Sequence, residues 1–226
     1  MVDTASRPRP QGIETDAWIL AGWTEYVALC DGELTQDDNT LDLEKARCYY
    51  DNGWMRIEMA ALGPWHGRHN SIVSKVVSLF ATLRMMRMVE LTNTSFRKVG
   101  EREAQPDLAF YLGKTFKLPP QNNQPVEIER YGAPHLVIEI ASTTLGDDLG
   151  RKRLLYERLG VQEYWVVNVA TSEVLAFAVD QGGSREIRDS QVLPGLALST
   201  VEAAMEQSAT ADDGAIARWL LQVFQP

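Results

Sequence analysis

The spacing of hydrophobic residues along the chain predicts an alternation of helices and strands. Apolar side chains recur every three or four positions between residues 66 and 89, which predicts a long helix with one buried face. Residues 136–141 are apolar except for Glu139, as expected for a central strand buried on both faces. A helix over 145–159, ended by Gly160, then precedes a strand over 163–169.

Shorter segments complete this order. They are a helix over 18–30 capped by Thr15 or Asp16, a hairpin over 48–59 turning at Asn52-Gly53, strands in 89–99 and at 108–112, a loop over 113–134, a hairpin over 174–188, and closing helices after 199. The order predicts an α/β (α+β) fold with a mixed central sheet flanked by helices. Residues 1–14 are expected to be a disordered N-terminal arm, and 15–226 a single domain.

Composition narrows the class of protein. The chain has 226 residues, of which 45% are hydrophobic and 23% charged, as in an ordinary soluble protein. No apolar run is long enough to span a bilayer, and the first residues do not resemble a signal peptide. The two cysteines have no metal-ligand spacing and are expected to be reduced thiols. These features predict a cytoplasmic protein without membrane contact.

The net charge of −9 argues against a nucleic-acid partner, but the charges are unevenly distributed. Residues 1–46 carry 3 basic and 10 acidic side chains, residues 47–158 carry 16 and 12, and residues 159–226 carry 3 and 9. The middle segment is therefore locally basic. Its cations either converge on one cleft that binds a polyanion or form an ordinary mixed surface, and the sequence leaves both open.

Two carboxylates at apolar strands are the first candidates for chemistry. Glu139 lies inside the predicted central strand, where a buried carboxylate needs a compensating partner. That partner is either a divalent cation or a lysine such as Lys152, which would make a simple internal salt bridge. Asp107 follows Pro106 at the start of another apolar strand, as either a turn residue or a second ligand of the same metal. The triplet Asp107, Glu139 and Lys152 favours a metal site.

Four linked motifs closely resemble the Uma-type putative restriction endonuclease family of the PD-(D/E)XK nuclease superfamily. They are Pro106 to Phe110, Pro134 to Ser142, the group Asp148, Lys152 and Tyr156 at spacing four, and Gly160 to Val167. The resemblance extends back to the Asn52-Gly53 hairpin and to the helix that carries His69 and Ile72, so it covers roughly residues 47–180.

The resemblance implies a restriction-endonuclease-like core that hydrolyses DNA phosphodiester bonds with Mg²⁺ (or Mn²⁺). Asp107 and Glu139 would hold the metal together with the backbone carbonyl of Ile140. The lysine that the superfamily places two residues after the glutamate is absent, because Ala141 stands there. Lys152 on the following helix would then be the catalytic cation that orients the attacking water or stabilises the transition state.

Supporting residues follow from the same comparison. Asp148 and Tyr156 share a helical face with Lys152, although an Asp-Lys surface pair with a tyrosine below it explains the spacing equally well. Many family members carry a glutamate on the first strand of the hairpin, and this chain does not. Glu58 on the partner strand is a candidate substitute or an exposed strand residue. His69, with His66, is expected to line the cleft or cap its helix.

Two rival functions stay open. The chain could be a catalytically silent nuclease-fold module that binds nucleic acid or a protein, as the acidic charge and the missing strand lysine suggest. A glycosidase using two carboxylates is less well supported, since a lysine accompanies the pair and no aromatic sugar platform is evident. A homodimer is expected by analogy, because enzymes that cut both DNA strands often use two sites related by a two-fold axis.

Overall fold

The computed structural model describes residues 14–31, 46–59, 63–180 and 183–225. They belong to two compact units, one within residues 1–60 and the other within residues 61–226. The arm predicted over 1–14 lies almost wholly outside the described residues. The two units are described separately below.

The N-terminal unit is a small antiparallel sheet with one helix. It consists of β1 (Trp18–Leu20), α1 (Trp23–Cys30), β2 (Ala46–Asp51) and β3 (Trp54–Met59), and β3 pairs with both β1 and β2. The predicted hairpin is confirmed, and its turn residues Asn52 and Gly53 have φ angles of 49° and 95°. The turn therefore uses the left-handed conformation that an Asn-Gly step provides.

The helix predicted over residues 18–30 is wrong in its first part. Residues Trp18–Leu20 form an edge strand whose Trp18 lies opposite Arg56 of β3, and the helix begins only after Gly22. The apolar residues of a short strand followed at once by a helix happen to fall at helical intervals, so the spacing alone does not separate the two elements. Tyr26 of α1 packs on Tyr50 of β2, with ring centroids 5.0 Å apart.

The C-terminal unit is built around a six-stranded mixed sheet. Its order is β12-β11-β10-β9-β7-β4, formed by β4 (Met88–Thr92), β7 (Leu108–Leu112), β9 (Leu136–Ala141), β10 (Glu163–Asn168), β11 (Glu173–Asp180) and β12 (Gly183–Ile187). Only β9 and β10 are parallel within it. Every residue of β9 is buried, as the apolar sequence of this segment predicts.

A second, smaller group of strands lies in the same unit. β5 (Phe96–Lys98) pairs with β6 (Arg102–Ala104) and in parallel with β8 (Val126–Glu127), which leads into α3 (Ile128–Tyr131). The segment predicted as a loop over 113–134 thus contains one short strand and one helical turn. Both elements are too short to leave a periodic signal in the sequence.

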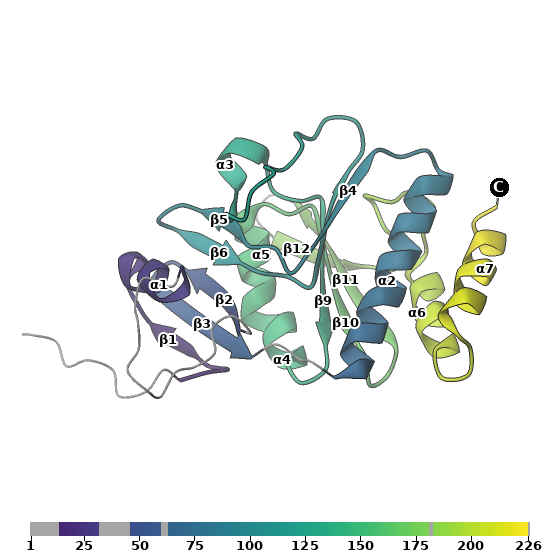
Figure 1. Cartoon of the computed structure of the whole chain (residues 1–226), viewed down its shortest axis with the longest axis horizontal. Helices are drawn as coiled ribbons and strands as arrows, with labels where there is room; N and C mark the ends of the chain where they lie inside the picture. The colour runs from purple at the N-terminus through teal and green to yellow at the C-terminus, as the bar shows by residue number, and fades with distance from the viewer. Residues whose placement is uncertain (1–13, 32–45, 60–62, 181–182, 226) are drawn as a thin grey trace, which may run out of the picture. The chain divides into compact units, whose positions relative to one another are not determined.

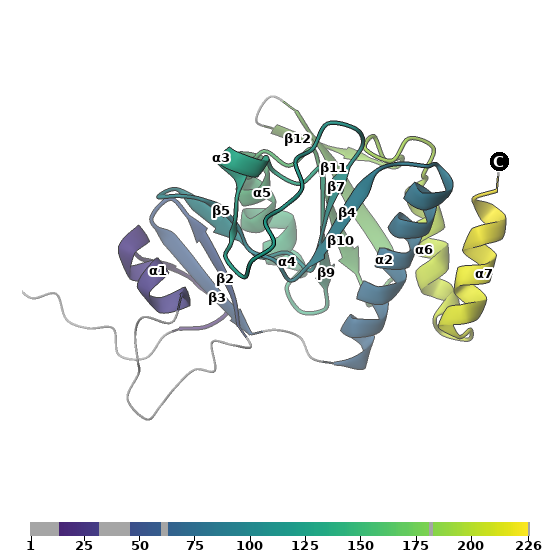
Figure 2. The same cartoon turned by 45° about the horizontal axis from the view of Figure 1, so that its top comes forward.

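Helices cover both faces of the large sheet (Figures 1 and 2). α2 (Pro64–Leu83), α6 (Leu198–Gln207) and α7 (Asp213–Val223) lie on one face. The other face carries the crossover between β9 and β10, which consists of α4 (Leu145–Asp147), a π-helical turn (Asp148–Lys152) and α5 (Arg153–Leu159). The predicted helix over 145–159 is therefore present with one widened turn. No helix in the described part of the chain is long and apolar enough to cross a membrane.

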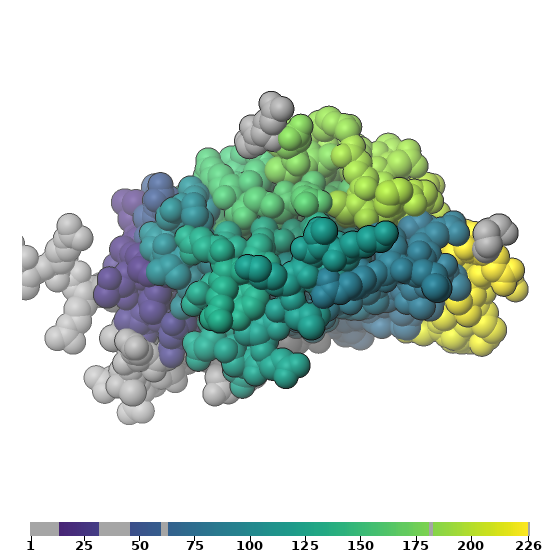
Figure 3. All heavy atoms as spheres, turned by 90° about the horizontal axis from the view of Figure 1, so that it is seen from above, coloured from purple at the N-terminus to yellow at the C-terminus, as the bar shows by residue number. Residues whose placement is uncertain are grey.

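The closing helices are attached to α2 by both ion pairs and apolar packing. The Arg68 side chain donates to the backbone carbonyls of Ser208 and Ala211 and to the Asp213 carboxylate, and Lys75 binds the other Asp213 oxygen at 2.8 Å. At the far ends of α2 and α7, Phe80 and Phe224 meet edge to face. Figure 3 shows α7 beside α2. The N-terminal turns of α2 are consequently held in place from outside the sheet.

Candidate active site

The two faces of β9 serve different purposes. Leu136, Ile138 and Ile140 belong to the main hydrophobic core with α2 and α6. Because side chains alternate along a strand, Val137 and Glu139 point to the opposite face, where Val137 lines an apolar pocket with Tyr156 of α5. Glu139 is therefore a carboxylate 1% exposed beneath the crossover helix.

Asp107 and Glu139 are brought together by strand register. The last antiparallel pair between β7 and β9 joins Leu108 to Ile138, so Asp107 and Glu139 are the next residues beyond this pair on the two segments. Asp107 itself forms a bend just before β7, and its carbonyl accepts from the Asn93 amide at 3.2 Å.

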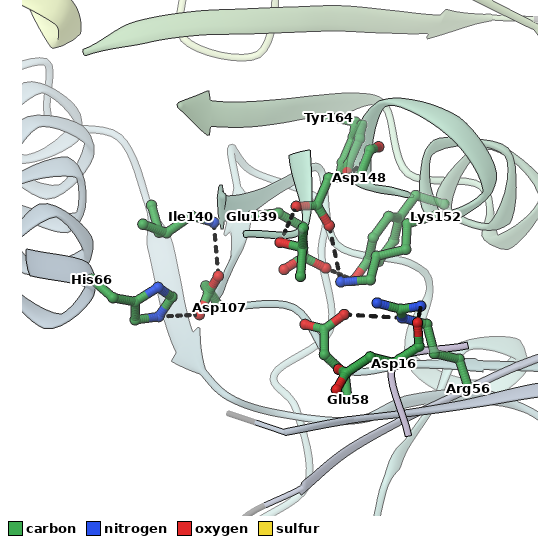
Figure 4. A network of polar contacts seen from close by, with 12 residues as sticks. Asp16, Arg56, Glu58, His66, Asp107, Glu139, Ile140, Asp148, Lys152 and Tyr164 are labelled. Carbon is green, nitrogen blue, oxygen red and sulfur yellow. Dashed lines mark hydrogen bonds and ion pairs between the residues drawn. The ribbon is translucent and has the colours of Figure 1, made fainter. Parts of the chain in front are cut away.

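Two donors from different layers bind the Asp107 carboxylate (Figure 4). His66 Nε2, on α2, lies 3.0 Å from Oδ1, and the Ile140 backbone N–H donates to Oδ2 at 2.7 Å. Asp107 is 1% exposed. An ionised carboxylate has about four acceptor positions, and these two bonds use one on each oxygen.

A tyrosine on the crossover binds Glu139. The Tyr156 hydroxyl donates to Glu139 Oε1 at 2.7 Å, and the Tyr156 ring stacks on Tyr164 of β10 with centroids 4.9 Å apart. The Tyr164 hydroxyl in turn donates to the Asp148 carbonyl at 3.0 Å. This chain of contacts ties the π-helical turn, α5 and the two parallel strands to one carboxylate.

Lys152 and Asp148 form a buried ion pair. Nζ of Lys152 lies 2.9 Å from Oδ1 of Asp148, and both side chains are 1% exposed. Thr144 Oγ1 donates to the other Asp148 oxygen at 2.6 Å. The interpretation of this pair as a surface feature is therefore wrong. The pair spans the π-helical turn, an irregularity that is frequent at functional sites.

The predicted supporting residues Glu58 and His69 have other contacts. Glu58 is buried on β3 of the N-terminal unit, where Arg56 Nε donates to it at 3.1 Å, so it is not an exposed strand residue. Its role as a metal ligand stays a prediction. His69 Nδ1 lies 2.8 Å from the Trp65 carbonyl of its own helix. The histidine that contacts Asp107 is His66, which the sequence analysis expected only to line the cleft or cap its helix, together with His69.

The donor set fits a magnesium-type ion. In the described ranges no three or more His, Cys, Asp or Glu side chains gather closely enough to share a metal ion, so a closed zinc-type site is not formed there. Mg²⁺ needs fewer protein ligands, because it is usually held by one or two carboxylates and keeps several waters. Asp107 and Glu139 could supply these carboxylates.

The backbone of Ile140 could add a third oxygen. Its N–H points to Asp107, and in a strand the carbonyl of a residue faces the same neighbour as its N–H. Pro106, which comes two residues before β7, has no N–H with which to pair that carbonyl.

Comparisons with known proteins agree with this fold. The pattern of the Uma2 family, described as putative restriction endonuclease, matches residues 23–212. A crystal structure of a putative nuclease of the DUF820 group from Anabaena variabilis has a TM-score of 0.51 and 16% sequence identity, over 82% of this chain and 99% of that one. This likeness shows a shared fold. No curated protein matches the chain.

Proposed function

Because the chain belongs to the Uma2 family of putative restriction endonucleases, we propose that it is a Mg²⁺- or Mn²⁺-dependent nuclease that hydrolyses DNA phosphodiester bonds. The observation that carries the proposal is that Asp107 and Glu139, both buried, directly follow the last residue pair of β7 and β9, with the crossover helix contacting Glu139 through Tyr156. A buried pair of carboxylates is costly without a cation, and the substrate of a nuclease is a polyanion whose reaction needs one.

In this proposal Asp107, Glu139 and the Ile140 carbonyl hold the metal. When bound, the ion lowers the pKa of a water and offsets negative charge on the phosphate. His66 and the Ile140 N–H hold the Asp107 carboxylate, while Tyr156 holds that of Glu139. Each carboxylate is thus held by a donor from another element before substrate arrives, which reduces the reorganisation needed at the site.

Lys152 supplies the cation that the superfamily usually carries on the strand. The water oxygen attacks phosphorus, the bond to the leaving oxygen breaks, and negative charge grows on the phosphate oxygens. The Lys152 ammonium is suited to stabilise this charge, because Asp148 holds it in place in a buried setting. Asp148 therefore acts through Lys152 rather than on the substrate.

We expect the protein to act in the cytoplasm, to cleave DNA there, and to do so as a homodimer. The locally basic segment 47–158 supplies the positive charge that a DNA substrate requires in an otherwise acidic chain. Two copies related by a two-fold axis would place two sites on the two strands of a duplex.

The test is a titration of the purified protein with Mg²⁺ and Mn²⁺, followed by cleavage of single- and double-stranded DNA in the same samples. Glu139→Gln should abolish cleavage and weaken metal binding. Glu90→Gln is the matched control, because Glu90 is a carboxylate on β4 that accepts from Ser74 and Ser78, and an amide can keep both contacts. Metal binding without cleavage would favour the silent interaction module, and undiminished cleavage by Glu139→Gln would overturn the assignment.

A further inference from the structure

We propose that His66 is the positioning residue of Asp107, and that its Nε2–H holds the carboxylate in the orientation that receives a divalent cation. The inference rests on the proposed function, since it assigns a role toward the same metal. His66 lies in the first turn of α2, and neither the strand motifs nor the crossover helix includes it. It therefore adds a residue from the opposite layer of the unit to the site.

The geometry indicates that His66 orients the Asp107 carboxylate rather than only packing against it. Asp107 can rotate about its side-chain bonds, and a single hydrogen bond leaves part of that freedom. His66 Nε2 at 3.0 Å from Oδ1 and the Ile140 N–H at 2.7 Å from Oδ2 bind different oxygens from different elements. Two such donors determine the plane of the carboxylate.

The other ring nitrogen of His66 argues against a purely structural histidine. His66 is 8% exposed, and its Nδ1 is buried with no hydrogen-bond partner among the residues that the structure describes. Buried polar atoms are nearly always paired, and an exception of this kind calls for an explanation. A phenylalanine would fill this position without an unpaired nitrogen, so retention of the imidazole points to the Nε2 contact.

The start of α2 is also held firmly enough to position a ligand. Arg68, two residues after His66, donates to the carbonyls of Ser208 and Ala211 and to Asp213. His69, on the same turn, instead contacts the Trp65 carbonyl of its own helix at 2.8 Å. The anchoring of this turn by Arg68 and the contact of His66 with Asp107 assign the positioning role to His66.

The test measures Mn²⁺ binding to the full chain by isothermal titration calorimetry, with thermal unfolding in EDTA recorded for each variant. His66→Phe keeps a ring of similar size but has no donor, and it should weaken Mn²⁺ binding about 10- to 100-fold, the usual effect of losing a residue that orients a metal ligand. His66→Gln places an amide N–H near the Nε2 position and should bind Mn²⁺ close to the wild-type affinity. His135→Asn is a control that removes an imidazole elsewhere and should leave Mn²⁺ affinity unchanged.

The outcomes separate the two proposals. If the wild type binds no Mn²⁺ and Glu139→Gln changes nothing, the proposed function fails and this inference with it. If the wild type binds Mn²⁺ and His66→Phe binds equally well, only the positioning role is overturned. Equal weakening by His66→Phe and His66→Gln would also overturn it, because the donor would not matter. Should His66→Phe not fold, His66→Asn replaces it, since its shorter amide does not reach Asp107.

Discussion

The Tyr156 hydroxyl donates to Oε1 of Glu139 at 2.7 Å across the parallel β9–β10 connection. Parallel neighbours in a sheet need a crossover that returns over one face, and here that crossover carries Tyr156, Lys152 and Asp148 over the face to which Glu139 points. The crossover therefore places the Tyr156 hydroxyl and the Lys152 ammonium on the side of the sheet to which the Glu139 carboxylate points. Under the proposed function, this arrangement would let Lys152 on the crossover take the place of a lysine on the strand.

Tyr156→Phe should leave Glu139 with one donor fewer while keeping the ring stack on Tyr164. We expect a loss of about 1–3 kcal/mol in the free energy of unfolding, the usual cost of removing a partner from a buried charged group, and a lower cleavage rate. Tyr164→Phe is the matched control, because it removes the bond to the Asp148 carbonyl instead. Urea unfolding and cleavage assays on both variants check this, and equal cleavage by the two would contradict a specific role for Tyr156.

Lys152→Met should cost about 3–5 kcal/mol of stability, because it leaves the Asp148 carboxylate buried without its cation. The double variant Lys152→Met/Asp148→Asn should recover most of this loss, since both charges are removed together. Neither variant should cleave DNA. Chemical denaturation measures the stability, and a double variant that regains cleavage along with stability would show that Lys152 acts only on the fold.

His135 should make the unfolding free energy depend on pH. Burial lowers the pKa of His135 below its usual 6.5, and its Nδ1 accepts from the Leu112 N–H at 3.1 Å, a contact that requires the neutral ring. The unfolded chain therefore binds this proton more readily, so the contribution is complete above about pH 6.5 and declines as the pH falls toward the lowered pKa. His135→Asn keeps an acceptor without titrating. The free energy of unfolding, measured from denaturation curves between pH 7 and pH 5, should fall more steeply with decreasing pH for the wild type than for this variant.

Asp213 should stabilise the closing helices at neutral pH and lose this effect in acid. Hydrogen bonds from Lys75 and Arg68 lower its pKa below the usual 3.8, so its contribution is present above that value and is lost as the pH falls through the lowered pKa. The three side chains are partly exposed, so Asp213→Asn should cost less than about 1 kcal/mol and the effect should shrink in high salt. Thermal unfolding at two salt concentrations checks this, and an effect that does not depend on salt would contradict an ionic origin.

Much of the fold was predictable from periodicity. The strand Leu136–Ala141 is apolar along its length because both faces are covered, and α2 has a continuous apolar face because it lies on the sheet. The predicted α2 ran to residue 89, whereas the helix ends at Leu83 and β4 begins at Met88. A positive φ of 55° at Met85 marks the break, and no sequence signal for it stands out. Elements as short as β1 offer too few residues for a pattern.

The residues of the candidate site stand out in the sequence, but their contacts do not. Asp107, Glu139, Lys152 and Tyr156 stand out because polar groups interrupt apolar strands or recur at helical spacing. Which carboxylate faces which depends on strand register, and the sequence does not state that β7 and β9 are neighbours. His66 was missed as a partner of Asp107 because 41 residues separate the two, and only the packing of α2 on the sheet brings them together.

The backbone bond from Ile140 to Asp107 has a spectroscopic consequence. The Ile140 N–H donates its hydrogen bond to the Asp107 side chain rather than to the backbone of another strand. Its protection from exchange with D₂O therefore depends on Asp107 remaining in place. In a nuclear magnetic resonance spectrum, this one amide would report the state of the carboxylate without substrate or turnover. Replacing Asp107 by alanine should accelerate exchange at Ile140 far more than at Ile138, which lies within the paired part of the same strand.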